Sequence, residues 1–114
     1  MNTTEWIQEF PAAVTVTDER GTILAMNDRA CAMFASDGGA ALIGANVLTC
    51  HPEVARSKLA AMLNERTVNC YTIEKNGKWK MFYQAPWYAG GIYRGFVEIA
   101  MDIPADLPHF VRLG

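Results

Sequence analysis

The residues best suited to chemistry stand together at Cys50-His51-Pro52-Glu53. A helix start lowers the pKa of a thiol, and an imidazole can act as its base, so a thiol-dependent reaction at Cys50 is one interpretation. Adjacent side chains rarely converge on one atom, however, and Cys31 and Cys70 stand far from Cys50 in the sequence. Buried, reduced cysteines are therefore favoured over a catalytic or metal-thiolate site.

His51 permits two interpretations. It precedes Pro52, a residue favoured at the first position of a helix. A His at this place commonly hydrogen-bonds a free amide of the helix start or a neighbouring carbonyl. The positive end of the helix dipole also favours neutral imidazole, which is the form that binds metal. A capping role and a ligand-binding role both stay open for His51.

Composition excludes several classes of function. The chain has 114 residues, 51% of them hydrophobic, and a formal net charge of −2, which suits one folded domain. No Lys/Arg cluster is present, so nucleic acid is not an expected partner. The sequence shows no signal peptide and no apolar run long enough to span a membrane, and we expect a cytoplasmic protein. No catalytic triad order, phosphate-binding Gly loop or pair of carboxylates is evident, so we expect no enzyme.

The first half of the chain predicts a hairpin and short helices. Residues 13–17 and 22–26 are β-rich runs joined by the polar turn Asp18-Glu19-Arg20-Gly21. Asn27 or Asp28 can cap a helix over residues 29–34. The small residues 35–41 predict turns and a short irregular helix.

The second half predicts one long helix and three strands. The helix begins at Pro52 and ends near Arg66, with an apolar stripe of Ala55, Leu59, Met62 and Leu63. Strands are expected over 68–74, 78–85 and 93–101, with a strong hairpin signal at Asn76-Gly77. This order of elements predicts an α+β fold with an antiparallel sheet and the helices on one of its faces.

Alternation in the middle strand separates two faces. Trp79, Met81, Tyr83 and Ala85 point one way, and Lys78, Lys80, Phe82 and Gln84 point the other. We assign the Trp79-Met81-Tyr83 face to the helix side. Together with Tyr71, Met62 and Phe34 it would surround the space between sheet and helices, which is either a filled core or a ligand cavity.

The chain resembles a PAS domain, the small sensor module of signalling proteins. The resemblance rests on Val14-Thr15-Val16-Thr17-Asp18-Glu19-Arg20-Gly21 with Ile23, on Asn27 after the second strand, on Ile43-Gly44, and on Gly95-Phe96-Val97-Glu98-Ile99 leading into Asp102-Ile103. It implies a five-stranded antiparallel sheet of order 2-1-5-4-3 over residues 11–103. Residues 1–10 would then be an N-terminal cap helix and residues 104–114 a C-terminal tail.

A narrower resemblance involves the segment that opens the long helix. Cys50-His51-Pro52-Glu53 is similar to the His-Pro-Glu segment of bacterial PAS domains that include haem-based carbon monoxide sensors. That similarity implies haem as a candidate cofactor with His51 as the iron ligand. The covalent-flavin subset of the family carries an Asn-Cys-Arg-Phe-Leu-like helix segment that this chain lacks, so flavin is less favoured.

The resemblance implies a non-enzymatic sensory or regulatory domain in signal transduction. It would bind a small ligand or cofactor, with haem as a candidate, and signal through changed association with a partner protein. The candidate binding residues are His51, Leu59, Met62, Tyr71, Trp79, Met81 and Tyr83. The alternative is a ligand-free dimerisation or protein-docking module with a filled core.

The N-terminal segment predicts self-association. Thr4 can cap a short helix that carries Trp6, Ile7 and Phe10 on one apolar face. We place Phe82 and Phe96 on the sheet face opposite the helices, where they need a cover. The segment would cover its own sheet or meet a second copy, and we expect a homodimer.

Overall fold

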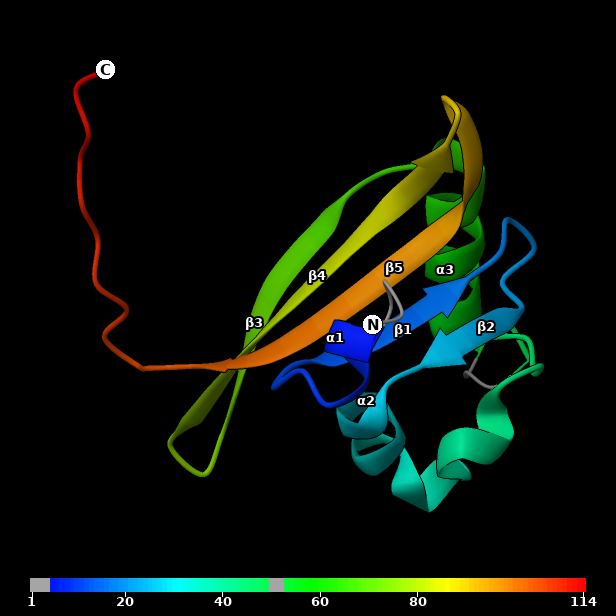
Figure 1. Cartoon of the computed structure of the whole chain (residues 1–114), viewed down its shortest axis with the longest axis horizontal. Helices are drawn as coiled ribbons and strands as arrows, with labels where there is room; N and C mark the ends of the chain where they lie inside the picture. Colours follow the sequence, from blue (N-terminus) through cyan, green and yellow to red (C-terminus); the bar gives the residue numbers. More distant parts are fainter. Residues whose placement is uncertain (1–4, 50–52) are drawn as a thin grey trace.

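The computed structural model describes residues 5–49 and 53–114, and it forms one twisted sheet with short helices around it (Figure 1). The elements in chain order are α1 (Glu5–Gln8), β1 (Ala13–Thr17), β2 (Ile23–Met26), α2 (Asp28–Met33), 3-10 turns at Ala35–Asp37 and Gly39–Leu42, α3 (Glu53–Glu65), β3 (Asn69–Lys75), β4 (Lys78–Ala89) and β5 (Ile92–Ile103). All strand pairs are antiparallel and the strand order is β2-β1-β5-β4-β3. The predicted fold class and strand order are confirmed.

The turns follow from local residue chemistry. Between β1 and β2, Asp18 Oδ1 accepts from the backbone N–H groups of Arg20 and Thr22, both at 2.9 Å. Between β3 and β4, Asn76 and Gly77 have φ angles of +55° and +75°, as a two-residue hairpin turn requires. Both hairpins form where the sequence predicts them.

Asn27 joins the first elements. Its Oδ1 accepts from the N–H of Ala30 at 3.1 Å, which caps α2, and from the N–H of Val14 at 2.9 Å. Its Nδ2 donates to the carbonyl oxygens of Ile7 and Ala12 at 2.9 and 2.8 Å. One buried carboxamide therefore holds α2, β1 and the N-terminal segment together, and the predicted cap is confirmed.

The core lies between the sheet and α2. Ala13, Ala30 and Ala100 are almost fully buried, and Ala30 has no exposed surface at all. These small side chains let α2 lie close to β1 and β2, so the core is compact there. Phe82 of β4 packs against the same cluster.

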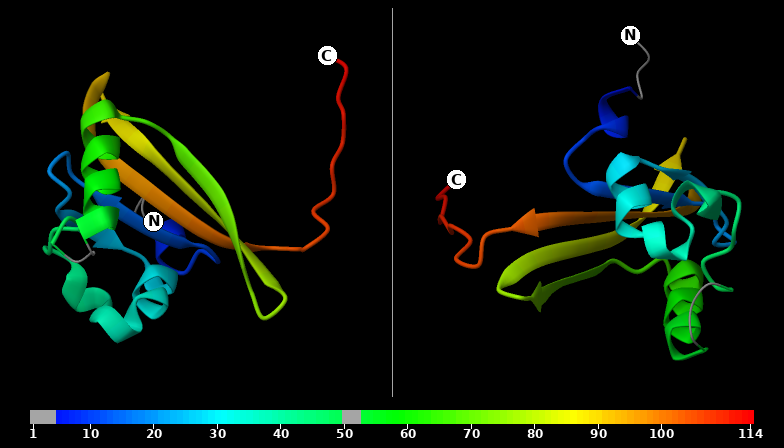
Figure 2. Two further views of the ribbon diagram at one scale, coloured as in Figure 1. Left: turned by 180° about the vertical axis from the view of Figure 1, so that it is seen from behind. Right: turned by 90° about the horizontal axis from the view of Figure 1, so that it is seen from below.

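The helices are divided between the two sides of the sheet (Figure 2). The helix α2, the 3-10 turns and α3 lie on one side, and α1 lies on the other. We call the first side the helix face of the sheet and the second side the outer face. The prediction that the N-terminal segment covers its own sheet or meets a second copy stays a prediction, because Trp6 and Phe10 are exposed at 60% and 42% in this structure.

The strand register corrects the predicted assignment of faces. Phe82 pairs with Ala100 and Gln84 with Glu98, and these residues belong to the helix face. Tyr83 pairs with Ile99 and therefore lies on the outer face, as do Trp79 and Met81 in the same alternation. The assignment of Trp79, Met81 and Tyr83 to the helix side is wrong, because both faces of β4 carry apolar side chains and alternation alone does not say which is covered.

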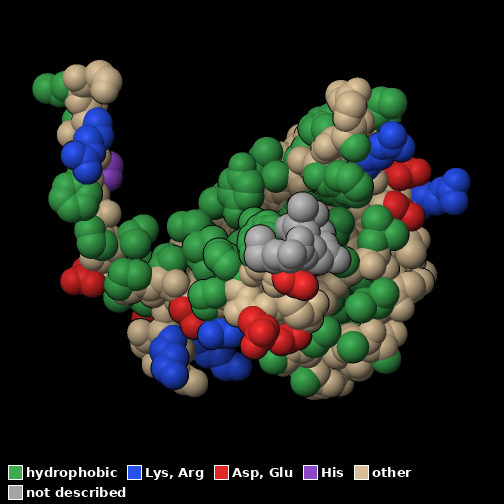
Figure 3. Space-filling model, viewed as in Figure 1, with side chains coloured by type: hydrophobic (Ala, Val, Ile, Leu, Met, Phe, Trp, Pro, Cys, Tyr) green, Lys and Arg blue, Asp and Glu red, His purple; other side chains and the backbone are tan. Residues whose placement is uncertain are grey.

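The correction also changes the predicted self-association surface. Phe96 is 8% exposed and Phe82 is packed, so neither is available on the outer face. Hydrophobic side chains nevertheless gather over the strands on that face (Figure 3), where Tyr83 is 42% exposed. Whether a second copy covers the outer face stays a prediction.

In the described part of the chain no helix has the length and apolarity to cross a bilayer.

The helix α3 is attached to the sheet near its C-terminal end. Tyr93 of β5 donates its hydroxyl to the carbonyl of Leu63 at 3.0 Å, and the Arg66 guanidinium lies 4.6 Å from the centre of the Tyr93 ring. Partial burial raises the pKa of Tyr93, while the charge of Arg66 acts in the opposite direction. This attachment fixes one wall of the site described next.

Candidate ligand pocket

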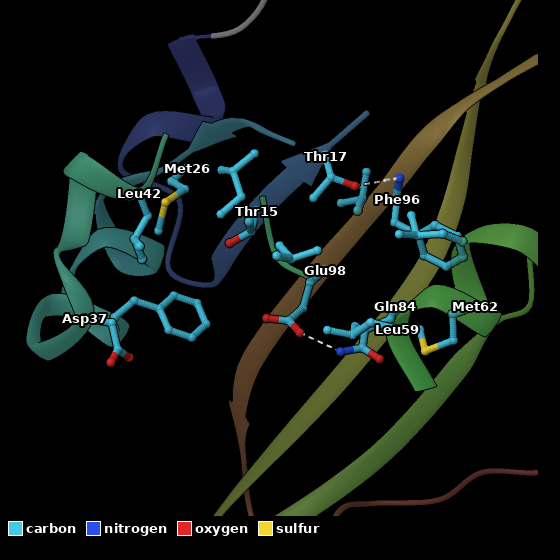
Figure 4. Close-up of a pocket in the computed structure, with 15 residues that line it drawn as sticks. Thr15, Thr17, Met26, Asp37, Leu42, Leu59, Met62, Gln84, Phe96 and Glu98 are labelled. Atoms are coloured by element: carbon cyan, nitrogen blue, oxygen red, sulfur yellow. Dashed lines mark hydrogen bonds between the residues drawn. The ribbon is translucent and has the colours of Figure 1, made fainter. Parts of the chain in front are cut away.

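A pocket of about 480 Å³ lies between the helix face of the sheet and α3 (Figure 4). Its size falls within the range of small-molecule sites. Its wall is mostly apolar, with polar groups on the strand side. The lining residues are Thr15, Thr17, Ile23, Met26, Phe34, Asp37, Leu42, Val47, Leu59, Met62, Leu63, Gln84, Phe96, Val97 and Glu98.

A row of polar side chains crosses three strands at the sheet side of the pocket. Asn69 Nδ2 donates to Gln84 Oε1 at 2.9 Å, and Gln84 Nε2 donates to Glu98 Oε2 at 2.6 Å. The row forms because Asn69 pairs with Gln84 and Gln84 with Glu98 in the strand register. Thr15 pairs with Glu98 from the other side and extends the row to β1. Side chains directly opposite one another in a sheet lie on one face and can bond.

The upper end of the pocket is fixed by Thr17. Its Oγ accepts from the N–H of Phe96 at 3.3 Å, and its carbonyl oxygen accepts from Trp87 Nε1 at 2.9 Å. The backbone of Gly95 approaches this strand so closely that a Cβ there would lie 2.0 Å from the Thr17 carbonyl oxygen. The close approach holds the Phe96 ring at the pocket wall.

Tyr71 stands beside the polar row. Its ring stacks on Phe82, with centroids 5.1 Å apart and planes 3° from parallel. Partial burial raises the pKa of Tyr71, and the negative charge of Glu98 raises it further. The negative charge of Glu98 therefore acts electrostatically on Tyr71, at this edge of the site.

The structure places the sequence-predicted residues in different locations. Leu59 and Met62 line the pocket. Tyr71 lies on the helix face but outside the lining. The three residues of the outer face, Trp79, Met81 and Tyr83, are likewise absent from the described lining. His51 and Cys50 lie outside the described residues, and Cys31 and Cys70 are free thiols.

Several lining residues were not predicted from the sequence. They include the polar residues Thr15, Thr17, Gln84 and Glu98 and the apolar residues Ile23 and Met26. A signal for them exists: the alternation in Ala13-Val14-Thr15-Val16-Thr17 puts both threonines on one face. Glu98 and Gln84 also alternate with apolar residues in their strands. Such a pattern resembles an exposed face, and only the register shows that it borders a pocket.

The described lining does not fit haem well. Met26 and Met62 supply thioethers, but the described lining contains no imidazole or thiolate, the ligands that most often hold haem iron. Its charged side chains are the carboxylates of Asp37 and Glu98, which would repel haem propionates. Haem ligation through His51 stays a prediction. In the described part of the chain no group of three or more His, Cys, Asp or Glu side chains is placed to hold a metal ion.

Comparison with known proteins identifies the fold. No protein-family model and no curated protein matches the sequence. Solved structures do match. The PAS domain of Bordetella pertussis BvgS has a TM-score of 0.63 at 19% identity, with 88% of this chain and 82% of that chain covered. The PAS domain of an HTR-like protein from Haloarcula marismortui has a TM-score of 0.60 at 18% identity, with 86% of each chain covered.

A third match is the Aer2 receptor of Vibrio cholerae, described as a dual PAS-heme oxygen sensor. Its TM-score is 0.58 at 21% identity, with 81% of this chain and 94% of that chain covered. At such identities the likeness concerns the fold. The chain has the PAS fold.

Proposed function

We propose that the chain is a sensory or regulatory domain of a signalling protein and that it binds a small molecule in the pocket between sheet and α3. The pocket is the observation that carries the proposal. A filled core would bring α3 against the sheet, whereas here about 480 Å³ separates Leu59 and Met62 of α3 from Gln84 and Glu98 of the sheet. The proposed activity is binding and not catalysis.

The central strand supplies a route for a signal. β5 lines the pocket through Phe96 and Glu98 and then leaves the sheet at Ile103. The residues beyond it extend away from the body (Figure 1). A ligand that changes the position of β5 would therefore change the position of the residues that follow Ile103. We expect this change to alter association with a partner protein.

Native mass spectrometry of the purified full chain tests the proposal. We expect a retained small molecule, and we expect Leu59→Trp to lose it because the larger side chain occupies the pocket. Tyr83→Trp is the matched control, since it adds bulk on the outer face. Repeated absence of a retained molecule in the unaltered chain, together with no binding in a screen of small apolar compounds, would contradict the proposal.

Added haem is one arm of the same experiment. A Soret band that shifts on binding and is lost in His51→Ala would support haem as the ligand. Identical spectra for the unaltered chain and His51→Ala would remove haem ligation through His51 and leave pocket binding to the mass spectrum.

A second candidate function is favoured by the outer face. Its apolar side chains, with Tyr83 at 42% and Trp6 at 60% exposure, suit a dimerisation or protein-docking module that needs no ligand. Sedimentation at micromolar concentration measures this: a dimer that Tyr83→Glu dissociates supports it. A monomer at every concentration contradicts dimerisation through this face.

A further inference from the structure

The charged groups of the pocket favour one class of ligand, and this inference rests on the proposed function. Glu98 is half-buried on the central strand, and its carboxylate lies between Asp37 on one side of the pocket and Leu59 on the other (Figure 4). The described lining contains no Lys, Arg or His. Among the described residues the one ion pair joins Lys80 to Asp102.

The neighbours of Glu98 hold it in place without neutralising it. Gln84 and Asn69 are amides, and each turns its donor end along the row toward Glu98. A carboxylate accepts several hydrogen bonds, and Gln84 is the donor found here for Oε2. A cationic ligand would give this carboxylate the charged partner that the described lining does not supply, and a hydrogen bond between two charged groups is stronger than one between neutral groups.

The opposite wall suits the rest of such a ligand. Leu59 and Met62 of α3 form an apolar surface across from the carboxylate, and Phe96 adds an aromatic ring from β5, two residues before Glu98 on the same face of the strand. Thioether and aromatic side chains adapt to flat apolar groups, and an aromatic face also attracts a cation. The wall would therefore hold an apolar body whose charged end meets Glu98.

We propose that the pocket selects small organic cations, such as amines, amidines or protonated nitrogen heterocycles with an apolar body, through the carboxylate of Glu98. Anionic ligands of the same shape are disfavoured because the described lining carries two carboxylates. This preference for cations is a separate claim from the retained small molecule of the proposed function. It holds whether or not the purified protein already carries a ligand.

Three probes of matched shape test the selectivity by isothermal titration calorimetry on the full chain. They are 2-naphthylmethylamine, 2-naphthylmethanol and 2-naphthoate. We expect the amine to bind about tenfold more tightly than the alcohol, which corresponds to about 1.4 kcal/mol, and the naphthoate to bind more weakly than the alcohol.

Two variants locate the effect. Glu98→Gln keeps an acceptor for Gln84 but removes the charge, so the advantage of the amine over the alcohol should disappear. Glu74→Gln removes the same charge from the exposed strand β3, outside the described lining, and should leave the ranking unchanged. Thermal unfolding of both variants verifies that they fold.

The outcomes separate this inference from the proposed function. Equal binding of the three probes, or an amine preference that persists in Glu98→Gln, overturns the inference while pocket binding stands. No binding of any probe at about 1 mM, a level that detects free energies near −4 kcal/mol, overturns the inference as well, and the native mass spectrum then decides the proposed function.

Discussion

Asn27 Nδ2 donates to the carbonyl oxygen of Ala12 at 2.8 Å, which ties the loop after β2 to the segment before β1. The same side chain is 4% exposed and makes three further hydrogen bonds with the backbone. Because a buried backbone group left without a partner costs free energy, this residue contributes to stability more than an ordinary helix cap.

Asn27→Ala is therefore expected to lower the free energy of unfolding by about 3 kcal/mol or more. Urea unfolding monitored by circular dichroism measures this. Asn46→Ala is the matched control, since Asn46 bonds the backbone of Arg20 and Leu48 near the surface and should cost about 1 kcal/mol. Equal losses in the two variants would contradict the role given to Asn27.

The neighbours Phe82 and Tyr83 test the assignment of the two sheet faces. Phe82→Ala removes a ring packed on the core and should cost about 3 kcal/mol. Tyr83→Ala acts on the outer face, where the side chain is 42% exposed, and should cost about 1 kcal/mol. Chemical unfolding of both variants gives the comparison, and the reverse ranking would restore the predicted faces.

Gly95 is expected to tolerate no side chain. Its φ is +149° and an added Cβ would lie 2.0 Å from the Thr17 carbonyl oxygen. We expect Gly95→Ala to lose about 4 kcal/mol or more, measured by thermal unfolding. Gly90→Ala, at a hairpin position with φ +58° and open space around it, should cost about 1 kcal/mol. A mild Gly95→Ala variant would show that β1 and β5 can separate at this point.

Alkaline pH should destabilise the fold through two tyrosines. Burial raises the pKa of Tyr71 and Tyr93 above the ordinary value of 10.0. Above pH 10 the unfolded chain loses these protons while the folded chain keeps them, so the unfolded state binds fewer protons and stability falls with rising pH. The fall ends once the folded-state pKa values are passed.

Absorbance at the tyrosinate band, followed through an alkaline titration, measures this. Tyr71→Phe and Tyr93→Phe should each remove signal from the high-pH end of the curve and lessen the loss of stability. If the signal that each substitution removes lies near pH 10, the ordinary pKa of tyrosine, the effect of burial on these pKa values is contradicted.

Local chemistry explains why much of the fold was predictable. The hairpin turn at Asn76-Gly77 and the helix cap at Asn27 each depend on residues that lie close together in the sequence. The face of β4 was not predictable in this way. Trp79, Met81 and Tyr83 are the larger apolar set, but the covered face is the one on which Phe82 meets Ala100, a residue of another strand.

The candidate site shows the same division. Leu59 and Met62 follow from the helix periodicity, and they line the pocket. Glu98 and Gln84 become neighbours only when β4 pairs with β5 in one register, and a shift by one residue would put them on the opposite face. Their role depends on contacts between strands, which a single sequence does not display.

The pairing of β1 with β5 has a kinetic consequence. It joins Ala13 to Ala100, so a long stretch of chain must be closed before the centre of the sheet can form. The hairpin of β1 and β2 and the meander of β3, β4 and β5 need only local contacts and are expected to form earlier. The pocket draws Thr15 and Met26 from the first unit and Gln84 and Glu98 from the second. A ligand thus meets no complete site until the two units have docked, and it should slow unfolding far more than it speeds folding.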